Sequence, residues 1–155
     1  MAKGYEQAVP LVTQVDFYVL EPQAQGNRFL LACRITEKAW RSGHRVYLHT
    51  LNQHECQHLD RLLWTFRELS FIPHAPIHSN PDLQRNPVLL GWDEQIGSEH
   101  DVLINLHPQV PTFFSRFERV VELIDNEAEV RTAGRQRYTF YKSRGYPLNT
   151  HKINL

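Results

Sequence analysis

Residues 54–58 carry two histidines and a glutamate at the spacing of a zinc-peptidase motif. The segment reads His54-Glu55-Cys56-Gln57-His58. In an H-E-x-x-H helix the two histidines bind zinc from one face, the glutamate polarises a water molecule, and a third ligand completes the site. His54 and His58 share a helical face, so zinc-dependent hydrolysis is one function that the sequence raises.

The remainder of the same helix argues against a zinc site. At about 100° per residue, the histidine pair lies on the face of Arg61 and Thr65 and is expected to point to solvent. The opposite face carries the apolar residues Cys56, Leu59, Leu63 and Phe66. His74 and His78, in a proline-rich segment, are the candidates for a third ligand. We therefore predict a solvated histidine face and no bound metal.

A second pattern lies near the C-terminus. Arg131, Arg135, Tyr138 and Lys142 are spaced by four, three and four positions, which stacks them on one face of a helix. Arginine binds carboxylates in a bidentate way, and a tyrosine ring adds apolar contact, so this basic stripe suits a carboxylate-rich peptide. Spacing alone leaves a solvated charged face as the alternative.

Further cations are expected near the stripe at Arg137, Arg144 and Lys152. The residues predicted to face the sheet instead are Val130, Ala133, Phe140 and Tyr141. Direct binding of single-stranded DNA is an alternative use of such a stripe, since basic grooves with stacking rings bind single strands. The chain has 17 Lys and Arg against 17 Asp and Glu, and this zero net charge disfavours a general nucleic-acid binder.

These side chains must be positioned by a fold, and the 155 residues suggest one domain over 1–155, with 1–14 as an N-terminal extension. Runs rich in β-branched and apolar residues predict strands at 15–20, 45–49, 88–90, 102–106 and 120–124. Apolar periodicity and end signals predict helices at 25–41, 52–67 and 127–144, with a short turn at 112–117 and a loop at 71–87. This alternation predicts a three-layer α/β/α Rossmann-like sandwich with a mainly parallel sheet of about five strands.

Several functions of such folds are disfavoured by what the chain lacks. The first strand-to-helix turn, 21–27, contains one glycine, and neither a dinucleotide fingerprint nor a P-loop occurs, so no cofactor is expected. No G-x-S-x-G elbow is present. Cys33 and Cys56 are predicted to be buried free thiols. No apolar run approaches the ~20 residues that span a bilayer, and a cytoplasmic protein is expected.

Five segments, taken in order, resemble the chi subunit of the DNA polymerase III holoenzyme. They are VDFY at 15–18, AWRSGHRV at 39–46, LDRLLWTF at 59–66, SFIPH at 70–74 and LNT at 148–150. The resemblance runs from Val15 to Thr150, and the order and spacing of the segments make it specific. The histidine motif at 54–58 is not part of the family pattern.

The resemblance implies a bacterial accessory subunit of the clamp-loader complex that has no catalytic chemistry of its own. Chi subunits bind the acidic, phenylalanine-ended tail of single-stranded DNA-binding protein at one surface. They bind the psi subunit, which joins chi to the clamp loader, at another. DNA would be reached only indirectly through these partners.

Residue by residue, the resemblance assigns Arg131 and Arg135 as the basic clamps of the tail site. The best-known family members have lysine at the first of these positions, so Arg131 is a departure that keeps the charge. Tyr138 and Ile124 match the aromatic and aliphatic positions of the same pocket. The basic stripe and the family site therefore coincide.

The psi-side surface would use Trp64 and Phe71, with Pro73 close by. Apolar residues at the mouth of a proline-rich loop are typical of a partner-binding patch. Core packing beside Leu63 is the alternative for Trp64, and a helicase-type protein is an alternative partner for this surface.

Overall fold

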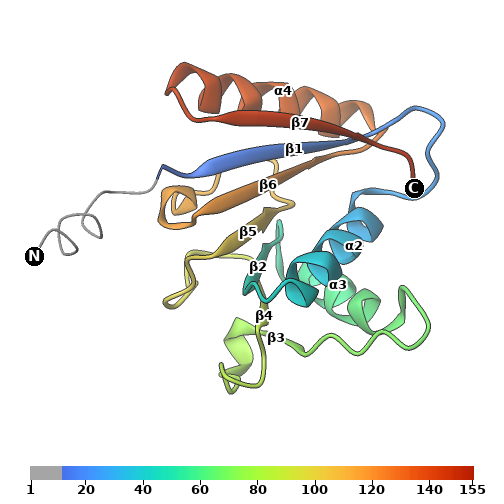
Figure 1. The fold of residues 1–155 in the computed structure, drawn as a ribbon, viewed down its shortest axis with the longest axis vertical. Helices are drawn as coiled ribbons and strands as arrows, with labels where there is room; N and C mark the ends of the chain where they lie inside the picture. The colour runs from blue at the N-terminus through green and yellow to red at the C-terminus, as the bar shows by residue number, and fades with distance from the viewer. Residues whose placement is uncertain (1–11) are drawn as a thin grey trace, which may run out of the picture.

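The computed structural model describes residues 12–155, and within them the chain forms seven strands, three α-helices and two 3-10 helices (Figure 1). The strands are β1 (Gln14–Leu20), β2 (Val46–His49), β3 (His74–Pro76), β4 (Val88–Gly91), β5 (Val102–Asn105), β6 (Arg119–Ile124) and β7 (Leu148–Ile153). The helices are α2 (Arg28–Arg41), α3 (Gln53–Thr65), α4 (Ala128–Ser143), η1 (Ile77–Ser79) and η2 (Phe114–Arg116). Residues 1–11 of the predicted N-terminal extension lie outside the described residues.

All described strands join one sheet in the order β3-β4-β2-β5-β6-β1-β7, and every pairing is parallel. The predicted parallel α/β/α sandwich is confirmed, but the sheet in residues 12–155 has seven strands where about five were expected. The two additional strands, β3 and β7, form its edges. β3 is three residues long and lies inside the predicted loop 71–87. β7 is largely polar and follows the last helix.

Two apolar clusters, one on each face of the sheet, make up the core. Alternation along the strands divides them: Val102 and Ile104 face the α2 and α3 side, whereas Leu103 between them faces the α4 side. The α4-side cluster contains the aromatic residues Phe17, Tyr47, Phe113, Phe114, Phe117 and Tyr141. Both faces are therefore buried, which explains why the central strands are continuous apolar runs.

The helix starts follow capping signals in the sequence. The Oδ1 atom of Asn27 accepts hydrogen bonds from the amides of Phe29 and Leu30 at 3.0 and 3.1 Å, so α2 begins three residues later than the predicted position 25. Asn52 caps α3 by accepting from the Glu55 amide at 2.9 Å, and the Glu55 carboxylate accepts from the Leu51 amide at 3.1 Å. These caps fix where both helices leave the carboxyl edge of the sheet.

Two further predictions concern the cysteines and the bilayer. Cys33 and Cys56 are buried free thiols, as predicted, and burial raises their pKa values to about 12 and about 11. Among the helices of residues 12–155, none combines the length and the apolar composition that crossing a bilayer requires.

Candidate functional site

The four residues predicted for tail binding line one cavity between α4 and the β1–β7 end of the sheet. This cavity, the α4 pocket, has a volume of about 230 Å³. It is lined by Phe17, Val19, Ile124, Arg131, Gly134, Arg135, Tyr138 and Thr150. The structure thus brings together Ile124, Arg131, Arg135 and Tyr138, which the sequence spreads over 15 positions from 124 to 138.

The floor of the α4 pocket is apolar and comes from three adjacent strands. Phe17 and Val19 point to the same face of β1 because they are two residues apart. The parallel register pairs Val19 with Ile124 on one side and Phe17 with Thr150 on the other. These residues therefore form a continuous surface at the α4 side of the sheet.

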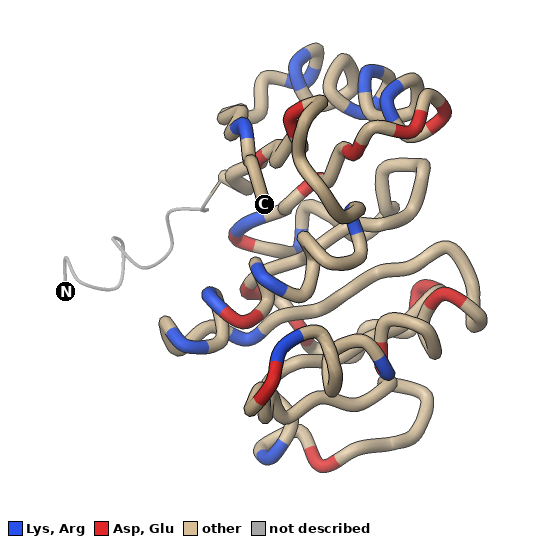
Figure 2. Tube along the Cα trace, turned by 90° about the vertical axis from the view of Figure 1, so that its right-hand side faces the viewer, with Lys and Arg blue, Asp and Glu red and all other residues tan. Residues whose placement is uncertain are grey.

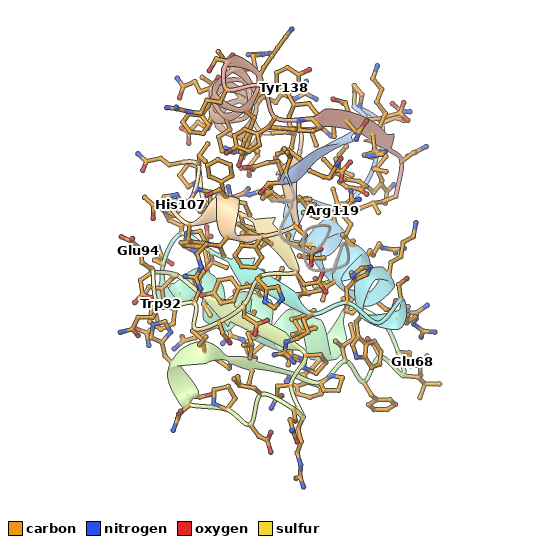
Figure 3. The ribbon with its side chains drawn as sticks, turned by 60° about the vertical axis from the view of Figure 1, so that its left-hand side comes forward. Glu68, Trp92, Glu94, His107, Arg119 and Tyr138 are labelled. Carbon is orange, nitrogen blue, oxygen red and sulfur yellow. The ribbon has the colours of Figure 1, made fainter. Side chains whose placement is uncertain are left out.

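Tyr138 closes one wall of this pocket. Its ring meets the ring of Phe17 edge-on, with centroids 5.2 Å apart and an interplanar angle of 68°, a favoured aromatic geometry. Figure 3 shows Tyr138 on α4 at the top of the molecule, above the sheet. The tyrosine is half-buried, so part of its ring remains available to a ligand.

Gly134 lets α4 approach the sheet at the pocket. A Cβ atom at this position would lie 2.1 Å from Cδ1 of Ile124, closer than non-bonded carbon atoms come. The absence of a side chain at Gly134 therefore allows Ile124 to extend beneath the helix. The depth of the pocket depends on this pair.

The two arginines at the rim are held differently. Arg131 donates from Nε to the Asp125 carbonyl at 3.3 Å and from a terminal nitrogen to Oδ1 of Asn126 at 2.6 Å, which fixes its guanidinium at the pocket. Arg135 is exposed and forms no ion pair with any residue in the described part of the chain. The rim therefore presents one ordered cation and one free cation, and the residues lining the pocket include no carboxylate.

The expectation that Arg137 adds surface charge is wrong. Its Nε donates to Oε1 of Glu122 at 2.7 Å, and both side chains are buried. The Glu122 carboxylate also accepts from the Tyr141 hydroxyl at 2.8 Å and from Nδ2 of Asn105 at 3.1 Å. Burial raises the pKa of the Glu122 carboxyl, and the charge of Arg137 with these donors opposes that rise. This network ties α4 to β5 and β6 and so sets the position of the pocket wall.

Of the four residues expected to face the sheet, Val130 and Ala133 are half-buried and belong to neither apolar cluster, whereas the two aromatic residues behave as expected. Tyr141 is buried and Phe140 packs edge-on against Phe114 at 5.8 Å, so both face the sheet side. Arg144 and Lys142 are exposed. Figure 2 shows Lys and Arg recurring along α4, with acidic positions at its N-terminal end. The predicted stripe is therefore present on the side of α4 that borders the pocket, where Arg131, Arg135 and Tyr138 line the cavity.

Four residues of the pocket were missed at the level of sequence, namely Phe17, Val19, Gly134 and Thr150. Gly134 falls between Arg131 and Arg135 on the same helical face, so the helical spacing that predicts the basic stripe also places Gly134 on it. Phe17 and Val19 show the alternation of a strand. Which helix covers their side of the sheet depends on the order of the strands, and residue spacing does not provide that order. Thr150 belongs to β7, a strand that was not predicted.

The predicted psi-side residues form a separate exposed patch at the opposite end of the sheet. Trp64 is 51% exposed and Phe71 is 69% exposed, which excludes core packing for Trp64. Leu69 extends the patch with 79% exposure and a left-handed backbone at φ 62°. Pro73 is half-buried behind them. The Trp64 ring lies 4.2 Å from the ring of buried His74, which supports it from beneath.

The histidine motif faces solvent as predicted. His54 and His58 are exposed, whereas Cys56 on the other face is buried. His74 bonds the carbonyls of Ile72 and Asp60 at 2.7 and 2.9 Å. Within residues 12–155, no group of three or more His, Cys, Asp or Glu side chains is placed to hold a metal ion.

Comparison with known proteins gives consistent matches over almost the same residues. The family model described as "DNA polymerase III chi subunit, HolC" matches residues 12–149. The DNA polymerase III subunit chi of Pseudomonas aeruginosa is 42% identical over 142 residues, covering 92% of this chain and 98% of the relative. The subunit chi of Escherichia coli is 32% identical over 121 residues, covering 77% and 82%, and that of Haemophilus influenzae is 24% identical over 139 residues, covering 89% and 96%.

The family model spans the described fold up to the second residue of β7. It includes the whole patch around Trp64 and every residue that lines the α4 pocket except Thr150. The identity and coverage of the Pseudomonas aeruginosa relative extend the match over nearly the full length of both proteins. The chain therefore belongs to the DNA polymerase III chi subunit family.

Proposed function

We propose that this protein is a non-catalytic adaptor of the bacterial polymerase III clamp-loader complex. Its α4 pocket binds the acidic, phenylalanine-ended tail of single-stranded DNA-binding protein, and the patch of Trp64, Leu69 and Phe71 binds the psi subunit. The observation that carries the proposal is the convergence of Ile124, Arg131, Arg135 and Tyr138 on one cavity, because the family resemblance assigns these same four residues to the tail site.

The size and lining of the α4 pocket suit a terminal phenylalanine. An apolar cavity of about 150 Å³ holds a benzene molecule, and the α4 pocket measures about 230 Å³. Phe17, Val19 and Ile124 supply an apolar floor, and Tyr138 supplies an aromatic wall. A phenyl ring seated there replaces water on a surface that the fold itself leaves uncovered.

The charge at the rim suits the rest of the tail. Arg131 and Arg135 line the pocket, and no carboxylate does. A peptide that ends in phenylalanine places its α-carboxylate within reach of a guanidinium when the ring is seated, and its acidic side chains follow nearby. Guanidinium groups bind carboxylates through paired hydrogen bonds, so both size and charge select this class of ligand.

The Trp64 patch suits a second protein. Trp64, Leu69 and Phe71 are large exposed apolar side chains in the end of α3 and the segment that joins it to β3. Exposed aromatic anchors of this kind carry much of the binding energy at protein interfaces. The patch lies at the β3 end of the sheet and the α4 pocket at the β7 end, so both partners fit at once.

The proposal is tested by titrating a short acidic peptide that ends in phenylalanine into the wild type and Arg135→Ala. Loss of a charge-assisted bond should weaken binding by about 1.5–3 kcal/mol, and added salt should weaken wild-type binding further. Arg85→Ala is the matched control, because Arg85 is exposed, lies outside the α4 pocket and pairs with Asp82 at the i,i+3 position. Equal affinities for all three proteins would contradict the assignment of this site.

A further inference from the structure

A second cavity, remote from α4, opens at the carboxyl ends of β2, β4 and β5. It has a volume of about 570 Å³, within the range of about 300–1,000 Å³ for small-ligand sites. His49 ends β2, Trp92 follows β4 and His107 follows β5. Open α/β sheets place their ligands at this edge. Figure 3 shows Trp92, Glu94 and His107 on one side of the molecule, below Tyr138.

His49 is an unpaired polar group in the wall of this cavity. Its side chain is 6% exposed, and its Nδ1 atom is buried without a hydrogen-bond partner among residues 12–155. A buried polar atom without a partner costs about 1–3 kcal/mol. Burial lowers the pKa of His49 to about 4, so the ring is neutral at physiological pH and carries one acceptor nitrogen. A ligand cannot reach the enclosed Nδ1 atom, but Nε2 also makes no hydrogen bond within residues 12–155 and is not enclosed, so Nε2 accepts from a ligand in the tautomer that carries its proton on Nδ1.

The charge of this cavity is the opposite of that of the α4 pocket. Asp93 and Glu94 line it, and no Lys or Arg is among the described residues that do. Burial alone would raise the pKa of Asp93, but hydrogen bonds from the Gln95 amide and the His78 ring hold it below the ordinary value. Asp93 is therefore ionised, and a cation is the complementary ligand.

Hydrogen bonds hold the two carboxylates in place. Oδ1 of Asp93 accepts from the Gln95 amide at 2.9 Å and Oδ2 lies 3.0 Å from Nε2 of His78. Oε1 of Glu94 accepts from the Thr112 hydroxyl at 3.0 Å. Each carboxylate oxygen has a further lone pair, so both groups can accept from a ligand without losing these bonds.

Flat rings shape the walls for a planar ligand. Trp92 stacks on His78 with centroids 3.8 Å apart and an angle of 20°. His49 stacks on His107 at 5.3 Å and 19°. Burial and the charge of Arg137 lower the pKa of His107, so this ring also stays neutral beside a cation. His78 covers one face of Trp92, so a planar cation would lie over the opposite face, from which a guanidinium reaches carboxylates in its own plane.

We propose that this cavity binds a guanidinium group, with Asp93 and Glu94 as its carboxylate partners, Trp92 as its stacking surface and His49 as a further acceptor. The group has five N–H donors and no acceptor, which matches two carboxylates and an unpaired imidazole nitrogen. It is supplied either by an arginine of a protein partner or by a free guanidino compound. This site is independent of the tail site, because the two share no lining residue.

The test is titration of ¹⁵N-labelled protein with methylguanidinium, methylammonium and an arginine-containing tripeptide, followed at the Trp92 indole and the histidine ring nitrogens. Methylguanidinium should bind more tightly than methylammonium, and Asp93→Asn/Glu94→Gln should weaken it about tenfold or more. Glu68→Gln/Glu118→Gln removes the same charge from two exposed positions outside the cavity and should leave binding unchanged. Unchanged binding of the acidic peptide at the α4 pocket verifies that each variant is folded.

Tighter binding of the tripeptide than of methylguanidinium identifies a protein arginine as the source, and the reverse order identifies a free guanidino compound. The proposal is overturned if neither probe shifts the Trp92 and His49 signals. It is equally overturned if methylammonium binds as well as methylguanidinium, or if both double variants lose binding to the same extent.

Discussion

At the scale of single residues, the α4 pocket depends on a glycine and an isoleucine as much as on its arginines. Arg135 supplies a free charge, but the seat for an aromatic ring exists because Gly134 leaves room for Ile124. The charged residues could be identified from the sequence because the charge of a side chain follows from its residue type. The role of Gly134 follows from a contact across two elements, which no local pattern contains.

Gly134→Ala tests this dependence. The added Cβ meets Cδ1 of Ile124 and forces that side chain to move, so peptide affinity should fall. Overpacking costs about 1–3 kcal/mol of stability, offset by up to about 1 kcal/mol from the better helix propensity of alanine. Ile124→Val removes the clashing atom, so the double variant Gly134→Ala/Ile124→Val should regain affinity relative to Gly134→Ala. Calorimetric titration with the acidic peptide measures both, and an additive loss in the double variant would refute the coupling.

The pH dependence of stability is a second expectation at the residue scale, and it rests on His49. Burial lowers the pKa of His49 from 6.5 to about 4, so between these values the unfolded chain binds a proton that the folded protein excludes. Stability from this group is complete above pH 6.5 and is lost as the pH falls towards 4. The loss is about 1.4 kcal/mol per pH unit, or about 2 kcal/mol between pH 7 and pH 5.

Urea unfolding of the wild type and His49→Phe at these two pH values isolates the contribution. The wild type should lose about 2 kcal/mol more than the variant on acidification. Parallel losses in the two proteins would show that His49 titrates in the folded state as it does in the unfolded chain.

At the scale of elements, the helices and central strands were predictable, whereas the edge strands were not. β2, β4 and β5 are buried on both faces and therefore appear as continuous apolar runs. β7 is half-exposed and mostly polar, and β3 is three residues long beside prolines, so neither carries that signal. Their places at the sheet edge are set by pairing with β1 and β4, which is tertiary information.

The placement of α4 shows the same limit. Its length and its exposed stripe follow from periodicity, but Arg137 was assigned to the surface by its residue type. Pairing with buried Glu122 makes Arg137 part of the core, and removal of one partner from such a pair costs about 3–5 kcal/mol. Helical spacing cannot reveal this pair, because Glu122 lies on β6, 15 residues before Arg137.

At the scale of the whole molecule, a neutral protein carries surfaces of different character in separate places. The α4 pocket has two cations at one end of the sheet, and the Trp64 patch is apolar at the other. An acidic cavity opens at the carboxyl ends of the central strands β2, β4 and β5. Zero net charge therefore disfavours general DNA binding while permitting strong local charge, as the proposed adaptor role requires.

The most direct test of the adaptor account is to map where the acidic, phenylalanine-ended peptide contacts ¹⁵N-labelled protein. The account predicts amide shifts at Phe17, Val19, Gly134 and Thr150, with the Trp64 indole signal unmoved and Trp64→Ala binding as the wild type does. A matched peptide that ends in alanine should produce much smaller shifts, because it leaves the apolar floor empty. Shifts concentrated at Trp64 and Phe71, or identical shifts with both peptides, would contradict the account.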